Sequence, residues 1–552
     1  MGKRTTVCII GVMLMQVPAG PARVLARSMS AADAGVAVKG WLADDPAPLG
    51  VALGRAIAGV DTFQDKNGRP MYHVVHIDPL GVVVVPAEDT AEPILAFAGI
   101  GTFDASPANP LAALIRHDLA ERLESGRPAA AGSVGIQETP ECQAKWRYLM
   151  ARADAGSHAL GLQGLETVSD LRVAPLIQTH WSQSDVCGAS CYNYYTPRNY
   201  PSGCVATAMA QLLYYHRHPA EGIGREEFDI QIRGAPSSAW TRGGDGEGGP
   251  YEWDRMPLKP DCNTTDAQRR AIGALCYDAS VAVNTDYARE GSAADSFIIA
   301  DALRNTFGFA NAVKGSDDGA GLGPGLMAML NPNLDAGYPA ILGIIGDDGH
   351  AVIVDGYGYD GSPFTTVYHH LNMGWAGQQD AWYDLPDIAS FDTVTACIYN
   401  ITPTDPGEII SGRVKDVLGR PLPGVRVQAV QRVPTQETTS NARGIYALVG
   451  LPARAVVTVT AQRPGLVFTA QPVQTGISAD WQNYSGNRWN IDLIGTLTAD
   501  RDGDIDVDLR DFALLARHWR VAGGEATDFD DLAGLAGSWL TGVAVRAADA
   551  RP

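Results

Sequence analysis

The chain has 552 residues, of which 45% are apolar and 19% are charged. This composition excludes a disordered chain, a coiled coil and a collagen, and the length suggests about three to five domains. The 62 acidic residues outnumber the 42 basic ones, so the net charge is 42 − 62 = −20. Binding to nucleic acid needs a basic surface, so we expect no nucleic-acid partner.

The first 32 residues have the pattern of an export signal. Lys3 and Arg4 precede an apolar run at 7–17, and small residues follow at 24–26 and again at 28–32. This order is typical of a cleavable signal peptide. The apolar run is too short for a membrane anchor, and no other stretch is long and apolar enough to span a bilayer. We therefore expect a secreted protein without a transmembrane segment, with residues 1–32 as its signal peptide.

Residues 33–172 form the next expected unit, which mixes helices and strands. The stretches MYHVVHI (71–77) and GVVVVPA (81–87) have the composition of strands. Residues 109–126 predict a helix, because Asn109 is a good N-cap and Pro110 suits the first helical position. The Ala- and Gly-rich stretch 129–141 predicts a linker.

Eight cysteines are present, and seven remain once Cys8 leaves with the signal. An odd number in an exported chain suggests one reactive thiol, and up to three disulfides whose pairing the sequence leaves open. No pair of cysteines has the spacing of a zinc site, so we expect no zinc.

Cys204 lies at the start of a predicted helix. Apolar residues recur with helical spacing from Val205 to Leu213, and Pro219 ends the pattern. The free amides and the dipole at a helix N-terminus stabilise a thiolate, and a free N–H there can hold an oxyanion. On this feature alone, a structural or disulfide-bonded cysteine is the alternative.

A thiolate nucleophile needs a base and a group that orients the base. His350 begins an apolar strand just after a turn, which makes it a candidate base. Asn372, on a second expected strand, can accept a hydrogen bond from an imidazole and fix its tautomer. Gln183 can supply a second oxyanion donor. Taken alone, each of the three is more often an ordinary turn or strand-end residue.

The order Gln183, Cys204, His350, Asn372 resembles that of papain-like cysteine peptidases, and of the streptopain family in particular. The similar stretches are HWSQSD, SGCVATAMAQLLYYHRHP, YEWDRMP, NTDYAREGS, GHAVIVDGYG and LNMGWAG. The resemblance implies an α+β, papain-like catalytic domain over residues 173–402. It also implies an endopeptidase that hydrolyses protein substrates through a thioester, with an apolar residue favoured just upstream of the scissile residue.

By this resemblance, Cys204 is the nucleophile and His350 the base. Asn372 orients His350, Gln183 helps to form the oxyanion hole, and Trp375 shields the site. No cofactor is implied for catalysis. The family usually reads N-W-G-W where this chain reads N-M-G-W, so Met373 replaces a Trp.

The substitution at Met373 leaves one alternative open, a catalytically impaired scaffold that acts as a binding or anchoring protein through its C-terminal modules. A second alternative, which does not depend on Met373, is acyl transfer to an amine rather than to water. Residues 33–172 resemble the inhibitory pro-segment of the same family, in GVVVVPAEDTAEPILAFAGIGTFD followed by NPL, which implies a zymogen. A domain that does not inhibit is the alternative for that segment.

Residues 409–494 carry short Val-rich alternating runs between turns, which predicts a small β-sandwich. The stretches ISGRVKDVLGRPLPGVRVQAV and ARGIYALVGLP resemble carboxypeptidase-regulatory-like domains. The resemblance implies a spacer or adhesive module.

The last module, residues 495–545, combines an acidic loop with a repeat. DRDGDIDVDLRD (500–511) has the oxygen-ligand pattern of a twelve-residue calcium loop. DFALLARHW recurs as DLAGLAGSW 20 residues later, which suggests paired helices. Loop and repeat resemble a dockerin and imply a cohesin-like partner. The expected ligands of a structural Ca²⁺ ion are Asp500, Asp502, Asp504, Asp508 and Asp511.

Two features of this module depart from a complete dockerin. Ile505 stands where a Gly usually makes the turn of the loop, and the second repeat has no full acidic loop before it. We therefore expect one calcium site, with a solvated acidic linker as the alternative.

Overall fold

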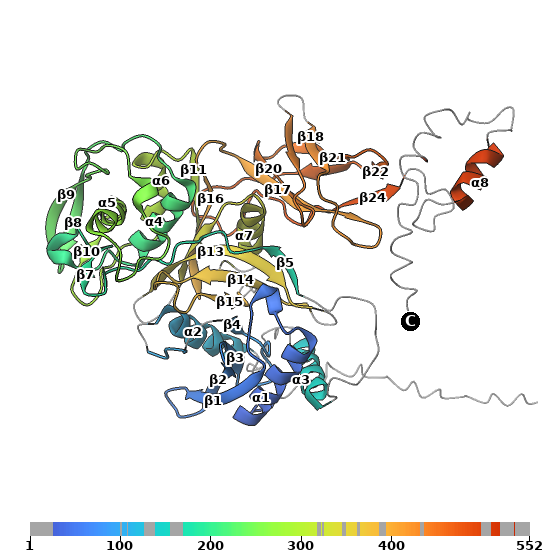
Figure 1. Cartoon of the computed structure of the whole chain (residues 1–552), viewed down its shortest axis with the longest axis horizontal. Coiled ribbons are helices and arrows are strands. Elements are labelled where there is room, and N and C mark those ends of the chain that lie inside the picture. Colours follow the sequence, from blue (N-terminus) through green and yellow to red (C-terminus); the bar gives the residue numbers. More distant parts are fainter. Residues whose placement is uncertain are drawn as a thin grey trace, which may run out of the picture.

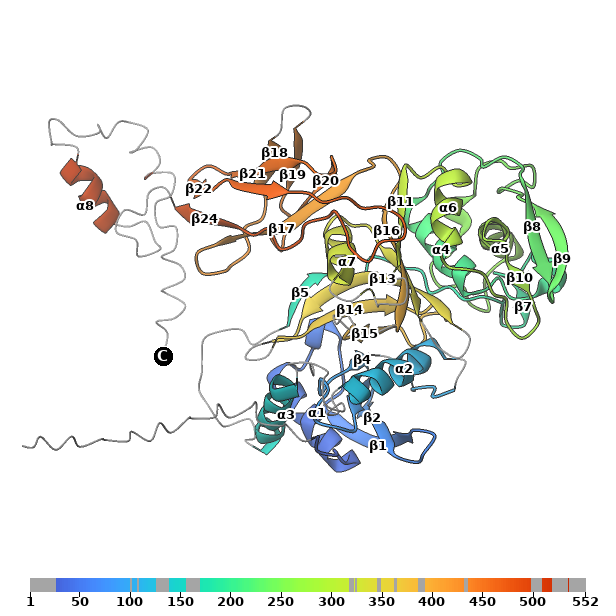
Figure 2. The same cartoon turned by 180° about the vertical axis from the view of Figure 1, so that it is seen from behind.

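The computed structural model describes three packed units and one C-terminal helix (Figure 1). In both views the central unit (residues 169–402) lies between an N-terminal unit (26–154) and a β-sandwich (408–497) (Figures 1 and 2). The described residues are 26–99, 102–106, 109–125, 139–154, 169–316, 322, 325–344, 349–361, 365–385, 393–430, 435–497, 509–518 and 535.

An 11-stranded sheet runs through the N-terminal and central units. Its order is β1-β2-β3-β4-β15-β14-β13-β12-β16-β11, and β5 pairs with β13. The units join where β4 meets β15 antiparallel, with Phe97 opposite Trp382 and Ala96 opposite Tyr383. The N-terminal strands are β1 (Ala56–Gln64), β2 (Pro70–Asp78), β3 (Val82–Pro86) and β4 (Ala96–Ala98). The central strands are β5 (Asp170–Val173), β11 (Asn311–Ser316), β12 (Ala340–Ile344), β13 (His350–Tyr359), β14 (Val367–Asn372), β15 (Ala381–Tyr383) and β16 (Val394–Thr402).

The alternation of strand β13 divides the central unit into two cores. Ala351 and Ile353 pack with helices α4 (Cys204–His216), α5 (Asp266–Ala282) and α6 (Ile298–Asn305). Val352 and Val354 face the opposite side, with α7 (Gly325–Asp335). Successive side chains of a strand point to opposite faces, so one apolar strand serves both cores.

Outside the large sheet, the helical side of the central unit carries two small sheets. Cys187 and Cys262 form a disulfide beside one of them, which decides one pairing that the sequence left open. The strands are β6 (Asp185–Val186) with β7 (Ala189–Ser190), and β8 (Glu227–Ile232) with β9 (Ala235–Trp240) and β10 (Asp286–Tyr287).

The N-terminal unit adds helices α1 (Ala31–Asp44), α2 (Pro110–Ser125) and α3 (Thr139–Asp154). The predicted cap of α2 is confirmed, because Asn109 Oδ1 accepts hydrogen bonds from the amides of Leu111 and Ala112. The linker prediction for 129–141 is wrong from Thr139 onward, where α3 begins. Tertiary contacts hold α3, since Trp146 Nε1 donates to the carbonyl of Ala91.

Residues 28–32 of the expected signal peptide belong to the folded N-terminal unit. Met29 is buried in its core, and Ser30 caps α1 in a capping box with Asp33. Cleavage after the earlier group of small residues, 24–26, would leave Met29 and Ser30 in the chain and both contacts intact.

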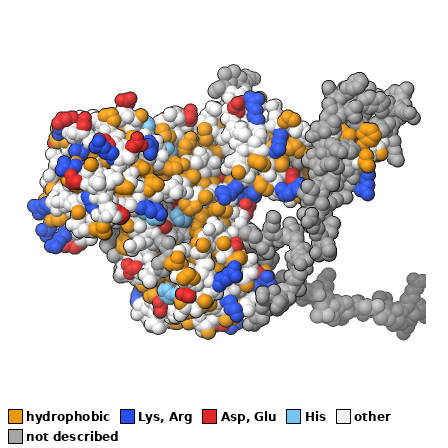
Figure 3. Space-filling model, viewed as in Figure 1, with side chains coloured by type: hydrophobic (Ala, Val, Ile, Leu, Met, Phe, Trp, Pro, Cys, Tyr) orange, Lys and Arg blue, Asp and Glu red, His pale blue; other side chains and the backbone are white. Residues whose placement is uncertain are grey.

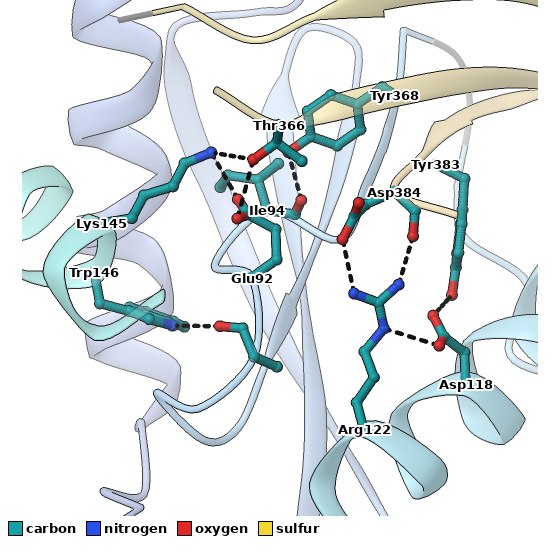
Figure 4. A network of polar contacts seen from close by, with 11 residues as sticks. Glu92, Ile94, Asp118, Arg122, Lys145, Trp146, Thr366, Tyr368, Tyr383 and Asp384 are labelled. Atoms are coloured by element: carbon teal, nitrogen blue, oxygen red, sulfur yellow. Dashed lines mark hydrogen bonds and ion pairs between the residues drawn. The ribbon is translucent and has the colours of Figure 1, made fainter. Parts of the chain in front are cut away.

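A buried network of charges joins the N-terminal unit to the central unit (Figure 4). Arg122 of α2 donates from Nε to Asp118 at 2.8 Å and from Nη1 to Asp384 at 2.7 Å. Tyr383 donates its hydroxyl to the other oxygen of Asp118. On α3, Lys145 reaches the carboxylate of Asp360 in the central unit. Each buried charge thus has a partner, so the two units fit in one relative position.

The predicted β-sandwich is confirmed, and its core lies between two four-stranded sheets. It packs directly on the central unit, where Ser411 donates to Asp335 at 2.7 Å and Arg413 donates to Asp170 at 2.7 Å. One sheet has β20 (Ile445–Leu451), β17 (Glu408–Asp416), β24 (Leu493–Leu497) and β22 (Leu466–Phe468). The other has β19 (Gln436–Thr439), β18 (Arg426–Val430), β21 (Val456–Gln462) and β23 (Gln471–Gln474).

In the last module, the structure describes helix α8 (Leu509–His518) and Leu535. Asp511 is buried in the first turn of α8 and Leu535 is buried, whereas Phe512 is exposed. The other expected calcium ligands, Asp500, Asp502, Asp504 and Asp508, lie outside the described residues. Within the described ranges, no group of three or more His, Cys, Asp and Glu residues could hold a metal ion. No described helix combines the length and the apolar character needed to cross a membrane.

The charge network makes a prediction about the uncleaved chain. Arg122→Ala should lower its free energy of unfolding by about 3–5 kcal/mol, because Asp118 and Asp384 would stay buried without their cation. Urea unfolding in a Cys204→Ala background measures the change. The control is Arg69→Ala, whose exposed pair with Asp65 should cost less than about 1 kcal/mol. Equal losses in the two variants would contradict the role of the network.

Candidate active site

Cys204 is the first residue of α4, and the local backbone explains its position. Gly203 precedes it with φ of 91°, a value that L side chains rarely adopt. A Cβ on Gly203 would lie 2.8 Å from the carbonyl oxygen of Ser292, so the segment at 292 also requires glycine there. The side chain of Cys204 is half-buried at the helix N-terminus.

His350, the first residue of β13, forms a hydrogen bond with the thiol of Cys204. Burial alone would raise the pKa of Cys204. The charge and hydrogen bond of His350, with the amides of Ala351 and Val205, outweigh burial and lower this pKa below its ordinary value. Burial likewise opposes protonation of His350, yet Cys204 and the carbonyl of Met373 raise its pKa. Both shifts favour a thiolate–imidazolium pair.

The group hydrogen-bonded to His350 Nε2 differs from the one we expected. His350 Nε2 lies 3.1 Å from the carbonyl oxygen of Met373, and a carbonyl can only accept. Nε2 therefore carries the proton, which leaves Nδ1 for the thiol. The side chain of Asn372, expected in this role, makes its hydrogen bonds elsewhere. The reason is local: β14 ends at Asn372, and the chain turns there so that the next carbonyl faces the imidazole.

Asn372 is instead the centre of a buried bridge beneath the site. Its Oδ1 accepts from Gln211 Nε2 of α4 and from the amide of Gly374, both at 3.0 Å. Its Nδ2 donates to the carbonyl of Thr179 at 3.2 Å. The bridge ties α4, which carries Cys204, to the turn that carries the Met373 carbonyl.

A second anchor of this turn is Asp380, which accepts a hydrogen bond from the amide of Met373 at 2.8 Å. Burial raises the pKa of Asp380 to about 6, opposed by the nearby His370 and the Met373 amide. The side chain of Met373 is fully buried in the core. Sequence reasoning missed Gln211 and Asp380, because their roles depend on a turn whose geometry no local pattern specifies.

The remaining two expected residues lie beside the pair. The carbonyl of Gln183 accepts from the amide of Ser202 at 2.8 Å, which holds Gln183 close to the N-terminus of α4. Within the described part of the chain its side chain makes no hydrogen bond. Trp375 is half-buried in the turn after Met373, two residues beyond the carbonyl that contacts His350.

The other free cysteines of the central unit are fully buried, and their pKa values are raised, not lowered. Burial raises the pKa of Cys191 to about 12 and raises those of Cys276 and Cys397 as well. Only Cys204, among the described thiols of this unit, combines partial exposure with a lowered pKa. It is the one suited to nucleophilic attack.

Two stretches of the chain match the sequence models of known families. Residues 181–383 match the sequence model of the Peptidase C10 family, and residues 409–481 match that of the carboxypeptidase regulatory-like domain. The chain is 23% identical to streptopain of Streptococcus pyogenes serotype M1 over 340 residues, 58% of this chain and 75% of streptopain.

Two further proteins are similar over different shares of the chain. The thiol protease/hemagglutinin PrtT of Porphyromonas gingivalis is 28% identical over 180 residues, 32% of this chain and 20% of PrtT. The structure of a prointerpain A fragment of Prevotella intermedia has a TM-score of 0.44 and 21% identity, over 63% of this chain and 99% of the fragment. From the sequence matches, the chain is a cysteine peptidase, a hydrolase.

The thiol–imidazole pair predicts how Cys204 titrates. Alkylation of the matured enzyme by iodoacetamide should occur at Cys204, with an apparent pKa below that of a free thiol. His350→Ala should raise this pKa, because burial would then act without the imidazolium, so labelling near neutral pH should slow. Rate–pH profiles with mass-spectrometric mapping measure both effects. His369→Ala is the control: His369 is a buried histidine of β14 whose ring bonds Asn331. An unchanged profile in His350→Ala would contradict the pairing.

Proposed function

We propose that this cysteine peptidase is an exported endopeptidase, made as a zymogen, that cleaves proteins through a thioester on Cys204. The observation that carries the proposal is the hydrogen-bonded pair of Cys204 and His350, whose pKa values shift toward the ionised forms. The matches to streptopain and PrtT support the peptidase activity. On the face drawn in Figure 3, acidic and basic side chains are interspersed, which fits protein substrates of mixed charge.

In the proposed reaction, the thiolate of Cys204 attacks the scissile carbonyl carbon. His350 then gives its proton to the leaving amine, and the C–N bond breaks to leave a thioester. Neutral His350 next takes a proton from water, whose oxygen attacks the thioester and releases the acid product and the thiol. Amides at the N-terminus of α4 and the side-chain amide of Gln183 stabilise the oxyanion.

The hydrogen bond between His350 and the Met373 carbonyl is compatible with activity, although Met373 replaces the Trp that is usual in the family. His350 Nε2 bonds the backbone of residue 373, so a change of side chain leaves this contact available. Asn372 is then a positioning residue, which acts through Gln211 and the turn at Gly374. Trp375 shields the pair from water.

The contacts between the N-terminal unit and the central unit support the zymogen proposal. This unit extends the sheet at β15 and also contacts the turn beside the site, where Gln379 Nε2 donates to the carbonyl of Thr102 at 2.7 Å. We propose export by a signal that ends near residue 26. Maturation then cleaves the chain between α3 and β5, because a cut there leaves both elements intact.

Self-processing gives the first test of this function. Cys204→Ala should abolish proteolysis and leave the precursor uncleaved. The wild type should be cut after Asp154 and before Asp170, inside the range of about 140–175 that the sequence suggests. Purified precursors are followed by N-terminal sequencing and mass. Cys191→Ala, which removes a buried thiol, is the matched control and should mature normally. Maturation of isolated Cys204→Ala, or casein hydrolysis by it, would contradict Cys204 as the nucleophile. A wild type that neither matures nor hydrolyses casein would favour the inactive-scaffold alternative.

We further propose that residues 495–545 bind one structural Ca²⁺ ion and dock a cohesin-like partner. Asp500, Asp502, Asp504, Asp508 and Asp511 would hold the ion. The buried carboxylate of Asp511 in the first turn of α8 fits the last ligand position of such a loop.

Calorimetric titration of the full chain should detect one calcium ion, with a dissociation constant on the order of 10⁻⁴ M, typical of extracellular modules. Asp500→Asn with Asp504→Asn should remove this heat, because the loop loses two anionic ligands. Asp65→Asn, in the exposed turn of the N-terminal unit, should leave it unchanged. Binding that survives the double substitution would contradict the loop as the site.

A further inference from the structure

The β-sandwich contacts the free edge of the large sheet through the segment at 480–482. The amide of Trp481 donates to the carbonyl of Lys314 at 2.7 Å, and the amide of Ser316 donates to the carbonyl of Gln482 at 3.1 Å. Gly315 and Gln482 form a parallel bridge. Since β11 is the last strand of the sheet, this segment acts as a short additional strand.

This pairing holds the indole of Trp481 on the surface of the central unit. The ring lies 4.8 Å from that of Phe297, centroid to centroid, and Lys314 Nζ lies 5.1 Å from its centre. Nevertheless, Trp481 remains 48% exposed. Its backbone φ of 65° is unusual for a bulky residue, and the structure around it maintains this conformation.

The charges around the ring are paired among themselves. Asp480 accepts from Arg304 Nη2 at 3.2 Å and from the amide of Lys314 at 2.9 Å. Lys314 and Arg304 both form ion pairs with Asp301. The surface offered by Trp481 and Phe297 is therefore aromatic, and these neighbouring charges are already neutralised.

Residues 292–297 run along the chain from the flank of Cys204 to the aromatic surface. The carbonyl of Ser292 lies against Gly203, the residue before Cys204: a Cβ added to Gly203 would be 2.8 Å from its oxygen. Ser296 lies against Gly343, and Gly343 pairs in the sheet with Ala351. The amide of Ala351 contacts the Cys204 thiol. Phe297 follows Ser296 directly, so the six residues 292–297 connect the flank of Cys204 with the residue that Trp481 contacts.

Strand pairing in the sheet gives an estimate of the distance between Ala351, beside the Cys204 thiol, and the segment at Trp481. Ala351 pairs with Gly343, Gly343 with Ala396, and Ala396 with Ser316, whose amide bonds Gln482. These are four strand intervals, or at most about 19 Å. Helices α4 and α6 pack in the same core, so Cys204 and Phe297 lie on the same side of the sheet. An extended peptide spans this distance with about five to six residues.

We propose that Trp481 and Phe297 form a secondary substrate-binding surface. It takes an aromatic or large apolar side chain of the polypeptide substrate, about five to six residues from the scissile bond. The inference rests on the proposed endopeptidase function and adds a specificity determinant contributed by the β-sandwich. Half-exposed aromatic rings favour such a partner, since aromatic pairs gain contact energy beyond the area they bury.

Peptides with one scissile sequence and a single Phe test the proposal. The Phe is moved one position at a time, from two to eight residues away on either side, with Ala as the reference. The matured wild type should show a higher kcat/KM for Phe at one distal position, by about 2- to 10-fold. Trp481→Ala should remove this advantage, Trp481→Phe should keep part of it, and peptides too short to reach the surface should be cleaved equally by all variants.

The control is Trp240→Ala. Trp240 is also an exposed Trp with a cation over its ring, since Arg225 lies 5.8 Å from the ring centre, but it lies on β9. This variant should keep the advantage of the distal Phe. The proposal is overturned if the wild type shows no distal preference, if Trp481→Ala retains it, or if short and long peptides lose rate equally.

A binding measurement separates this inference from the proposed function. Matured enzyme with Cys204 alkylated by iodoacetamide is titrated with fluorescein-labelled Phe and Ala peptides, and anisotropy gives the affinities. A Phe advantage that needs Trp481 supports the surface even if no peptide is hydrolysed, a result that would count against the peptidase function alone. Equal affinities for the two peptides would overturn the surface while leaving hydrolysis intact.

Discussion

The contact of α4 with strand β13 is the constraint on which the site depends. Cys204 begins the helix and His350 begins the strand, so the thiol and the imidazole meet only if the two elements pack in one register. Apolar packing in the shared core brings them together but does not fix a register by itself. The buried bridge from Gln211 through Asn372 to Thr179 adds directional hydrogen bonds, and a displaced helix would leave these amides unsatisfied.

The same sheet explains why both flanking units are packed so closely on the central one. A sheet edge exposes unpaired amides and carbonyls, which invite pairing with other chains. Strand β4 covers the edge at β15, and the segment at Trp481 covers the edge at β11. At the first edge, buried charges add to the pairing. At the second, Lys314 and Arg304 pair with Asp301 and Asp480.

The backbone, more than the side chains, surrounds the pair of Cys204 and His350 with hydrogen bonds. The Met373 carbonyl bonds His350, and the amides of Val205 and Ala351 contact the thiol. Backbone groups are present whatever the side chain, so replacing a Trp by Met at 373 changes core packing without removing the acceptor. What the sequence must preserve is the turn, and Asp380, Gln211 and Gly374 hold it.

The sequence by itself located Cys204 at a helix N-terminus, His350 at a strand start, the capped helix after Asn109 and the Val-rich sandwich. These features depend on local rules of capping, periodicity and turn chemistry. Tertiary structure alone decided that the Met373 carbonyl, and not the Asn372 side chain, bonds His350. It also decided that β4 joins β15, and that Trp481 lies beside Phe297. Each of these contacts links residues remote in sequence or depends on the path of a turn, and no local pattern encodes either.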